Sequence, residues 1–216
     1  MDARYRPISP PAERGARGRD LPAYVSNGVI GLRVRENPLE AGMCIVSGFV
    51  GRHHELRVEA AAAAPYPLAG DIAVDGLWTR DRIGAVEAID QAYDFETGEL
   101  VSRLAVSLDG VRAEVTIVVF ASRTHPTLVC EEISLAVDRA CEIGIRLDTG
   151  FDGVRGEAVE RRLETPGEDE PVCDGSLLWR SEGGLGRCGL ALLTEGPDGA
   201  ERSQTPSDRQ GPVATT

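Results

Sequence analysis

The stretch LPAYVSNGVIGLR, residues 21–33, is where folded structure is expected to begin. Its two glycines allow tight backbone geometry, and the apolar residues around them suit the start of a buried strand. The residues before it are rich in proline and arginine, and they predict an irregular leader over residues 1–20.

The clearest periodic pattern lies between residues 99 and 149. Four runs alternate apolar and polar residues with period two, and Asp109-Gly110 joins the first two as a two-residue hairpin turn. The apolar positions are Leu100, Leu104, Val106 and Leu108; Val111, Ala113, Val115, Ile117 and Val119; Val129, Ile133, Leu135 and Val137; and Ile143, Ile145 and Leu147. Successive strands with one apolar face predict an antiparallel meander that must bury this face on a second layer.

Shorter strands are expected at residues 43–50, 77–78, 157–163, 177–179 and 190–193, with a turn at Asp75-Gly76. Leu56 and Val58 continue the alternation between the first two of these strands. The alanine run at residues 60–64 favours helix, but Pro65 and Pro67 stop it, so residues 60–70 are expected to form a loop or a short helical turn. Residues 81–93 are expected to form a weak helix at most, or two short strands in a sandwich.

The sequence therefore predicts a β-sandwich over residues 21–195, followed by a disordered tail over residues 196–216, where Pro, Ser, Asp, Gln and Thr dominate.

Composition limits the classes of binding partner and the cellular compartment that are expected. The 216 residues carry a net charge of −12, which repels phosphate backbones and anionic lipids, so neither nucleic acid nor a membrane is expected as a partner. The five cysteines include no C-x-x-C pair, and most are expected to be small buried residues in a reducing compartment. With no apolar leader, a cytoplasmic protein is expected.

The LP…NG…G.R pattern of residues 21–33 resembles the opening of the amino-terminal domain of glycoside hydrolase family 65. The similarity continues loosely through Gly42, Gly48-Phe49 and Glu55-Leu56, up to about residue 195. This family includes trehalose, maltose and kojibiose phosphorylases, acid trehalases and a glucosyl-galactosyl-hydroxylysine glucosidase. The resemblance implies an all-β, antiparallel β-sandwich of the galactose mutarotase-like super-sandwich type.

The resemblance also implies that catalysis and structural support belong to different domains. In the family, the acid glutamate and the phosphate-binding loop belong to a helical barrel that follows this domain. The chain is therefore expected to be a non-catalytic domain or fragment, truncated relative to the family, that braces the catalytic barrel and edges its pocket. The expected partners are an α-glucoside or oligosaccharide and the helical-barrel catalytic domain, with homo-oligomer formation left open. Whether the chain has enzyme activity of its own is left open too.

The candidate substrate-binding residues are Tyr66, Trp78 and His54. The family's pocket-edging contact is expected in the segment between residues 48 and 66. Phe49 and Trp179 complete the aromatics that could stack on sugar rings, although most of these rings are expected to anchor the core.

Other motifs carry less weight. Residues 184–189 match G-x-G-x-x-G, but Gly196-Pro197 leaves no room for the helix of a nucleotide site, so a hairpin loop is expected and no cofactor. Adjacent residues on a strand point to opposite faces, so His53-His54 suggests no metal site. For the same reason Glu131-Glu132 should place one carboxylate inward and one outward.

Two rival functions remain. A stand-alone carbohydrate-binding module would bind oligosaccharides through Tyr66 or Trp78. An independent aldose-mutarotase-like enzyme would need a histidine and a glutamate to meet on a concave sheet.

Overall fold

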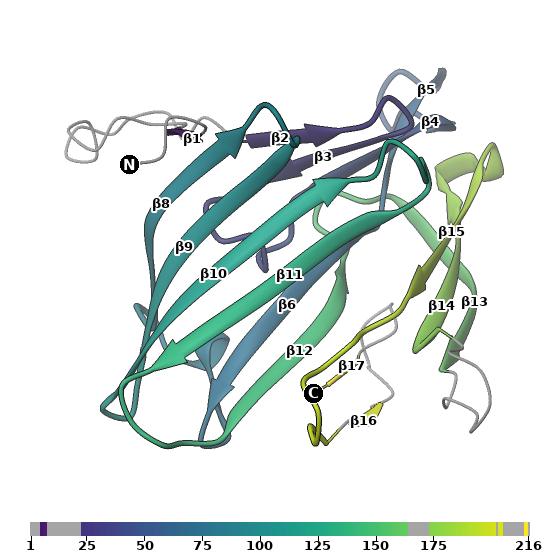
Figure 1. Cartoon of the computed structure of the whole chain (residues 1–216). Coiled ribbons are helices and arrows are strands. Elements are labelled where there is room, and N and C mark those ends of the chain that lie inside the picture. Colours follow the sequence, from purple (N-terminus) through teal and green to yellow (C-terminus); the bar gives the residue numbers. More distant parts are fainter. Residues whose placement is uncertain (1–4, 8–22, 164–172, 202, 205–213, 216) are drawn as a thin grey trace. The chain divides into compact units, whose positions relative to one another are not determined.

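The computed structural model describes residues 5–7, 23–163, 173–201, 203–204 and 214–215. These residues form antiparallel β-strands connected by turns, with two 3-10 turns and no α-helix (Figure 1). The all-β, antiparallel sandwich-type fold expected from the sequence is therefore confirmed. No helix in the described part of the chain is long and apolar enough to cross a membrane.

Contacts between residues divide the chain into two compact units. The first unit combines Met1–Pro38 with Asp71–Ile143, and the second combines Leu39–Gly70 with Gly144–Thr216. The boundary passes through strand β6, Tyr66–Val74, so no linker separates the units at that point.

The first unit is built on a five-stranded sheet with the strand order β1-β8-β9-β10-β11. Its strands are β1 (Tyr5–Pro7), β2 (Ala23–Ser26), β3 (Ile30–Val34), the end of β6, β7 (Leu77–Trp78), β8 (Val86–Asp94), β9 (Glu99–Leu108), β10 (Val111–Ala121) and β11 (Val129–Val137), with the 3-10 turn η2 (Thr79–Asp81) after β7. The β2–β3 hairpin lies against β9 and β10, so its apolar residues and those of the sheet bury each other. This pairing of two layers is what the alternating pattern requires.

The β9–β10 hairpin follows the sequence pattern closely. Leu104 pairs with Val115 in an unbroken register, and both side chains are buried. Asp109 and Gly110 have φ angles of 47° and 75°, the left-handed pair that a tight two-residue hairpin needs. The turn predicted from Asp-Gly is confirmed.

Asn27 explains the motif that opens the folded chain. Its Oδ1 accepts hydrogen bonds from the backbone N–H groups of Val29 (3.0 Å) and Ile30 (2.9 Å), which closes the β2–β3 turn. Its Nδ2 donates to the carbonyl oxygens of Ser122 (2.7 Å) and Pro126 (3.0 Å) in the β10–β11 connection. The asparagine therefore joins the hairpin to a segment almost a hundred residues away.

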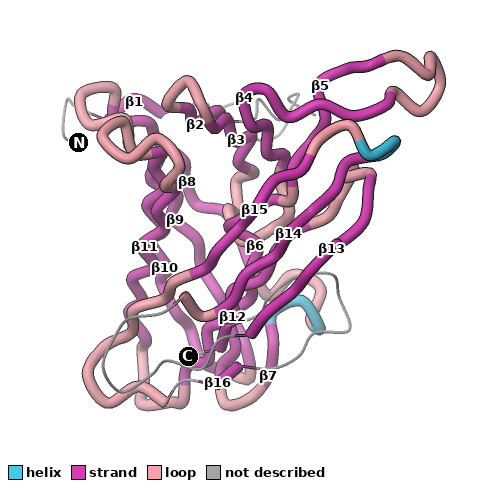
Figure 2. The backbone as a smooth tube through the Cα atoms, turned by 90° about the vertical axis from the view of Figure 1, so that its right-hand side faces the viewer, coloured by secondary structure: helices cyan, strands magenta, loops and turns pink. Residues whose placement is uncertain are grey.

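The second unit contains three groups of strands. They are the β4–β5 hairpin (Met43–Arg52 and Glu59–Ala64), the sheet β13-β14-β15 (Gly156–Leu163, Gly175–Ser181 and Arg187–Leu192), and the start of β6 beside β12 (Ile143–Gly150), β17 (Ala214–Thr215) and β16 (Ser203–Gln204). The 3-10 turn η3, Glu182–Gly184, links β14 to β15. Figure 2 shows β13, β14 and β15 running side by side.

The alanine run corrects an expectation. Residues 60–70 form neither a loop nor a helical turn, because Glu59–Ala64 is strand β5 and pairs with β4. A Cβ atom on Gly51 would lie 3.2 Å from that of Ala62 and 3.1 Å from that of Ser181. Gly51 therefore has little room for a side chain where β4, β5 and β14 approach each other, and pairing with β4 overrides the helix propensity of the alanine run.

Other observed strand boundaries also differ from those expected from the sequence. Residues 56–58 belong to the turn between β4 and β5 rather than to a strand, and residues 86–94 form the single strand β8. The strands expected at 43–50, 77–78, 157–163, 177–179 and 190–193 are present with boundaries shifted by a few residues.

Most of the proposed leader and tail lies outside the described residues. The leader does contain the short strand β1, which pairs with β8. In the tail, residues 203–204 and 214–215 pair with each other, and residues 214–215 also pair with β12. These four residues form short strand pairings.

Candidate functional site

The tip of the β4–β5 hairpin is organised by His53. Its Nδ1 accepts hydrogen bonds from the backbone N–H groups of Glu55 (3.3 Å) and Leu56 (3.2 Å). Its backbone N–H donates to the carbonyl oxygen of Val58 (2.8 Å), which closes the loop. The His53 ring therefore stabilises the turn, and the ring of His54 beside it is more available to a ligand.

His54 is that neighbouring ring. It stacks on His53 with ring centroids 4.9 Å apart and planes tilted by 21°. Its Nε2 lies 3.5 Å from Oε1 of Glu55, and 43% of its side chain is exposed. This histidine–glutamate pair lies on a hairpin tip rather than on a concave sheet, so it does not form the arrangement that a mutarotase-like site needs.

Beside this tip, four charged side chains share one face of β13, β14 and the residues flanking them. Glu157 lies opposite Arg180 in the strand register, and the N–H of Glu182 donates to the carbonyl oxygen of Arg155 (3.2 Å). All four residues line the same depression, and together the two pairs form a square of alternating charge. We call these four residues the arginine–glutamate square.

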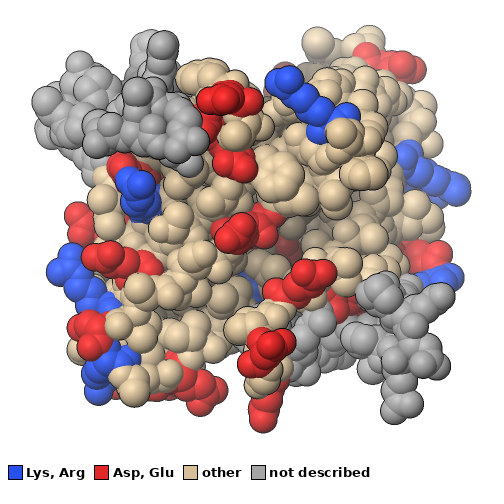
Figure 3. Space-filling model, viewed as in Figure 1, with Lys and Arg blue, Asp and Glu red and all other residues tan. Residues whose placement is uncertain are grey.

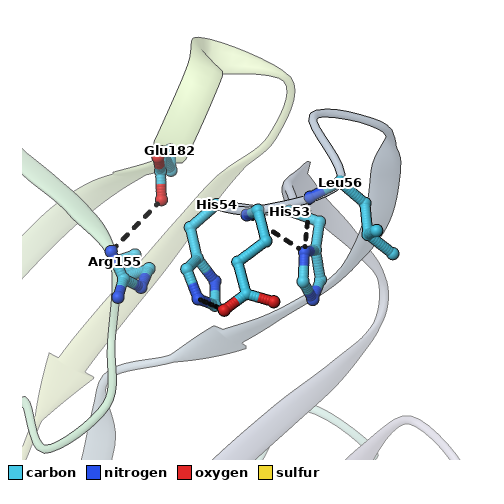
Figure 4. A network of polar contacts seen from close by, with 6 residues as sticks. His53, His54, Leu56, Arg155 and Glu182 are labelled. Atoms are coloured by element: carbon cyan, nitrogen blue, oxygen red, sulfur yellow. Dashed lines mark hydrogen bonds and ion pairs between the residues drawn. The ribbon is translucent and has the colours of Figure 1, made fainter.

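The two arginine–glutamate pairs in the square differ in how closely their charged groups approach each other. Arg180 makes two hydrogen bonds to Oε1 of Glu157, one from Nε at 3.0 Å and one from a terminal nitrogen. A terminal nitrogen of Arg155 approaches Oε2 of Glu182 only to 3.9 Å, which is beyond hydrogen-bond distance (Figure 4). That Oε2 atom has no exposed surface and no hydrogen-bond partner.

The square lines an open depression of about 730 Å³. The lining residues are Val154, Arg155, Gly156, Glu157, Arg180, Ser181, Glu182, Gly183 and Gly184. A Cβ atom on Gly183 would lie 2.8 Å from Cβ of Arg52, the last residue of β4. The histidine tip, which follows Arg52 directly, therefore adjoins the depression.

Ser181 fixes the floor of this depression. Its hydroxyl donates to the carbonyl oxygen of Val50 (2.7 Å) and accepts a hydrogen bond from the N–H of Gly186 (2.9 Å). These bonds tie the end of β14 both to β4 and to the turn before β15. The charged face is thus held on an anchored hairpin rather than on a loose loop.

The structure separates the three predicted binding residues. Tyr66 is fully buried at the start of β6, so its ring offers no face to a ligand. His54 lies beyond the Arg52–Glu59 end of the β4–β5 hairpin, whereas Tyr66 follows Ala64 at the other end. Trp78 is half-buried and belongs to the first unit. Of the three, only His54 adjoins the depression.

Three of the four aromatic residues considered for sugar stacking, Tyr66, Phe49 and Trp179, are core anchors, as expected. Phe49 and Trp179 are 5% and 1% exposed, and Phe151 packs against Trp179 with ring centroids 5.1 Å apart. Tyr24 and Phe95, in the first unit, are the more exposed rings at 62% and 72%.

The sequence carries a signal for the square that strand periodicity alone does not reveal. Residues 155–157 read Arg-Gly-Glu and residues 180–182 read Arg-Ser-Glu. Two such R-x-E segments on antiparallel neighbours place each arginine opposite a glutamate when Glu157 lies opposite Arg180, which is the register that the structure has. The strand expected at 157–163 begins too late to include the first segment.

The remaining motifs behave as loops and strands. Residues 184–189 run from η3 through a turn into β15, with no helix behind them, so the hairpin interpretation of G-x-G-x-x-G is confirmed. No group of three histidine, cysteine, aspartate or glutamate side chains that could hold a metal ion occurs in the part of the chain that the structure describes.

Among the described residues, four titratable groups have raised pKa values, and in Cys130 the cause is burial. Burial raises the pKa of Glu131, on β11, to about 8, and its Oε1 atom has no hydrogen-bond partner. Glu132 is exposed, so the expected alternation of these two residues is confirmed. Burial also raises the pKa of Cys44 to about 12, with a smaller contribution from Cys188, whose own pKa burial raises to about 11.

These thiols are therefore poor nucleophiles near neutral pH. All five cysteines are free, and Cys44 alone is buried, whereas the other four are half-buried. The expectation that most cysteines would be buried is wrong.

No family model matches the chain, and no curated protein is similar to it at the level of sequence.

Proposed function

We propose that this chain is a non-catalytic β-sandwich domain of a family 65-like glycoside hydrolase or phosphorylase that acts on α-glucosides. Its role is to brace the catalytic barrel and to edge the pocket of that barrel. The observation that carries the proposal is the role of the residue 21–33 motif. Asn27 makes four hydrogen bonds that close the β2–β3 turn and join it to the β10–β11 connection. The residues behind the family resemblance thus maintain an antiparallel sandwich, which is the role expected of a supporting domain.

The arrangement of carboxylates also supports a non-catalytic role. Glycoside hydrolysis normally uses two carboxyl groups, one of which donates a proton from a site that keeps it neutral. In the depression, Glu157 and Glu182 each face an arginine instead. Glu131 has the raised pKa of a proton donor but belongs to the other unit and lines no part of this depression.

An activity assay tests the proposal directly. The purified chain is incubated with trehalose, maltose and kojibiose, with and without inorganic phosphate, and released glucose and glucose phosphate are measured. We expect no turnover above buffer, together with binding of α-glucosides in preference to the β-linked disaccharide cellobiose. Turnover that persists through successive purification steps would overturn the non-catalytic assignment.

Exposed aromatic rings favour a second candidate, a stand-alone carbohydrate-binding module. Such modules stack sugar rings on accessible aromatic side chains, and Phe95 and Tyr24 are largely exposed while Trp78 is half-buried. Under this alternative, Phe95→Ala or Trp78→Ala abolishes oligosaccharide binding. A supporting domain would keep its weaker binding in both variants.

A further inference from the structure

The depression in the second unit has the chemistry of a ligand site rather than of a surface salt-bridge ladder. Exposed ion pairs contribute roughly 0–1 kcal/mol each, so stability alone gives little reason for two of them side by side. The Arg155–Glu182 pair gives even less, because its closest nitrogen and oxygen atoms remain 3.9 Å apart. Glu182 keeps a buried carboxylate oxygen without a hydrogen-bond donor. Buried polar atoms of this kind normally have a partner, so this oxygen is available to accept a hydrogen bond from a bound molecule.

We propose that this depression binds a neutral saccharide through pairs of adjacent hydroxyl groups. The inference deepens and rests on the proposed role in handling α-glucosides. A vicinal diol presents two oxygen atoms that both donate and accept, and the flat forks of guanidinium and carboxylate match such pairs. The lining carries two arginines and two glutamates and no other charged side chain, so it has no net preference for an ionic ligand.

The surroundings disfavour anionic ligands. The chain has a net charge of −12, and acidic side chains are spread over the face drawn in Figure 3. A phosphorylated sugar or a nucleotide would therefore be repelled on approach. The depression is open rather than enclosed, which suits one end of an oligosaccharide better than a fully buried small molecule.

The histidine tip supplies an apolar edge. His53 and His54 stack on each other, and the contact between Gly183 and Arg52 places the tip next to the square. Sugar rings have a face of C–H groups that packs on flat aromatic rings. His54 therefore forms a rim against which a saccharide bound by Arg155 and Glu182 can rest.

Calorimetric titration with maltotriose tests the site in the full chain. We expect weak, measurable binding by the unmodified protein, and a loss of affinity of about tenfold or more in Arg155→Gln and in Glu182→Gln, because each variant removes a charged hydrogen-bonding group. The matched control is Arg162→Gln, also on β13, where an exposed arginine likewise pairs with a glutamate, Glu160, but lies outside the depression. This control should keep the original affinity, and near-ultraviolet circular dichroism verifies that each variant is folded.

The possible outcomes distinguish a failure of the proposed saccharide site from a failure of the proposed α-glucoside function. Maltotriose binding that both depression variants retain would overturn the site and leave the α-glucoside proposal standing. Cellotriose binding that Arg155→Gln abolishes, without any maltotriose binding, would support the saccharide site and overturn the α-glucoside specificity. No binding of either trisaccharide at millimolar concentration would overturn the site.

Discussion

Two hairpins of similar length are built on opposite principles. The β9–β10 hairpin turns through two residues, keeps an unbroken register and buries the apolar face that its alternation predicts. The β4–β5 hairpin shifts register between Ile45 and Val50 and ends in the tip around His53, where Arg57 has a φ angle of 59°. Contacts from Ser181 and Gly186, more than a hundred residues further along the chain, hold it in place. The first hairpin is determined by local rules, and the second depends on a distant partner.

The largest expected difference between the hairpins comes from removing the same side chain in each. Leu104 in β9 is 1% exposed, whereas Leu56 at the tip of β4–β5 is 69% exposed. Leu104→Ala should lower the free energy of unfolding by roughly 2–5 kcal/mol, and Leu56→Ala by less than roughly 0.5 kcal/mol. Urea denaturation followed by fluorescence measures both. Similar losses in the two variants would contradict the assigned burial.

The sheet that contains β9 and β10 continues into β11, where Glu131 should make stability depend on pH. Burial raises its pKa to about 8 in the folded protein, whereas the unfolded carboxyl has its ordinary pKa of about 4.3. Below that ordinary value both states hold the proton, and stability is highest with respect to this group. As the pH rises towards 8, the unfolded state releases the proton more readily, so the folded state loses stability.

Glu131→Gln removes this dependence. The variant should be more stable than the unmodified protein by roughly 1–3 kcal/mol at pH 8, and the difference should vanish near pH 4.5. Thermal unfolding across this pH range measures it. The control Glu132→Gln alters the exposed neighbour and should leave the pH profile unchanged. Parallel profiles for the unmodified protein and Glu131→Gln would show that the carboxyl is solvated.

The turn of the local hairpin can be broken at one residue. Gly110 has a φ angle of 75°, which strains a β-branched side chain, so Gly110→Val should cost roughly 1–3 kcal/mol. Gly189 in β15 provides the control, because it has an ordinary strand conformation and no heavy atom lies within 4 Å of the position that a Cβ atom would take. Gly189→Val should be neutral or slightly stabilising. Equal shifts in the denaturation midpoint would contradict the turn assignment.

The smallest expected effect probes the distant support of β4–β5. Ser181→Ala removes the hydroxyl that donates to Val50 and accepts from Gly186, at a cost of about 1 kcal/mol. Amide hydrogen exchange at Gly186 should accelerate in the variant. Ser107→Ala, at an exposed position on β9, is the matched control and should change neither quantity. Unchanged protection at Gly186 would show that this support is not needed.

The sequence by itself determined most of the first unit. Alternation with period two assigns β9, β10 and β11 and their buried faces, because successive strand side chains necessarily point to opposite sides. Asp109-Gly110 assigns the turn, because few residues accept left-handed backbone angles at both positions. Both rules act between near neighbours, so a single sequence reveals them.

Only the tertiary structure decided the second unit's hairpin and the candidate site. The alanine run at residues 60–64 carries helix propensity, and it becomes a strand because it pairs with β4. The arginine–glutamate square combines two R-x-E segments separated by more than twenty residues, and the Ser181 hydroxyl beside it ties β14 to β4. Such contacts form between residues that are distant in sequence, and short-range patterns carry no information about which distant segments will meet.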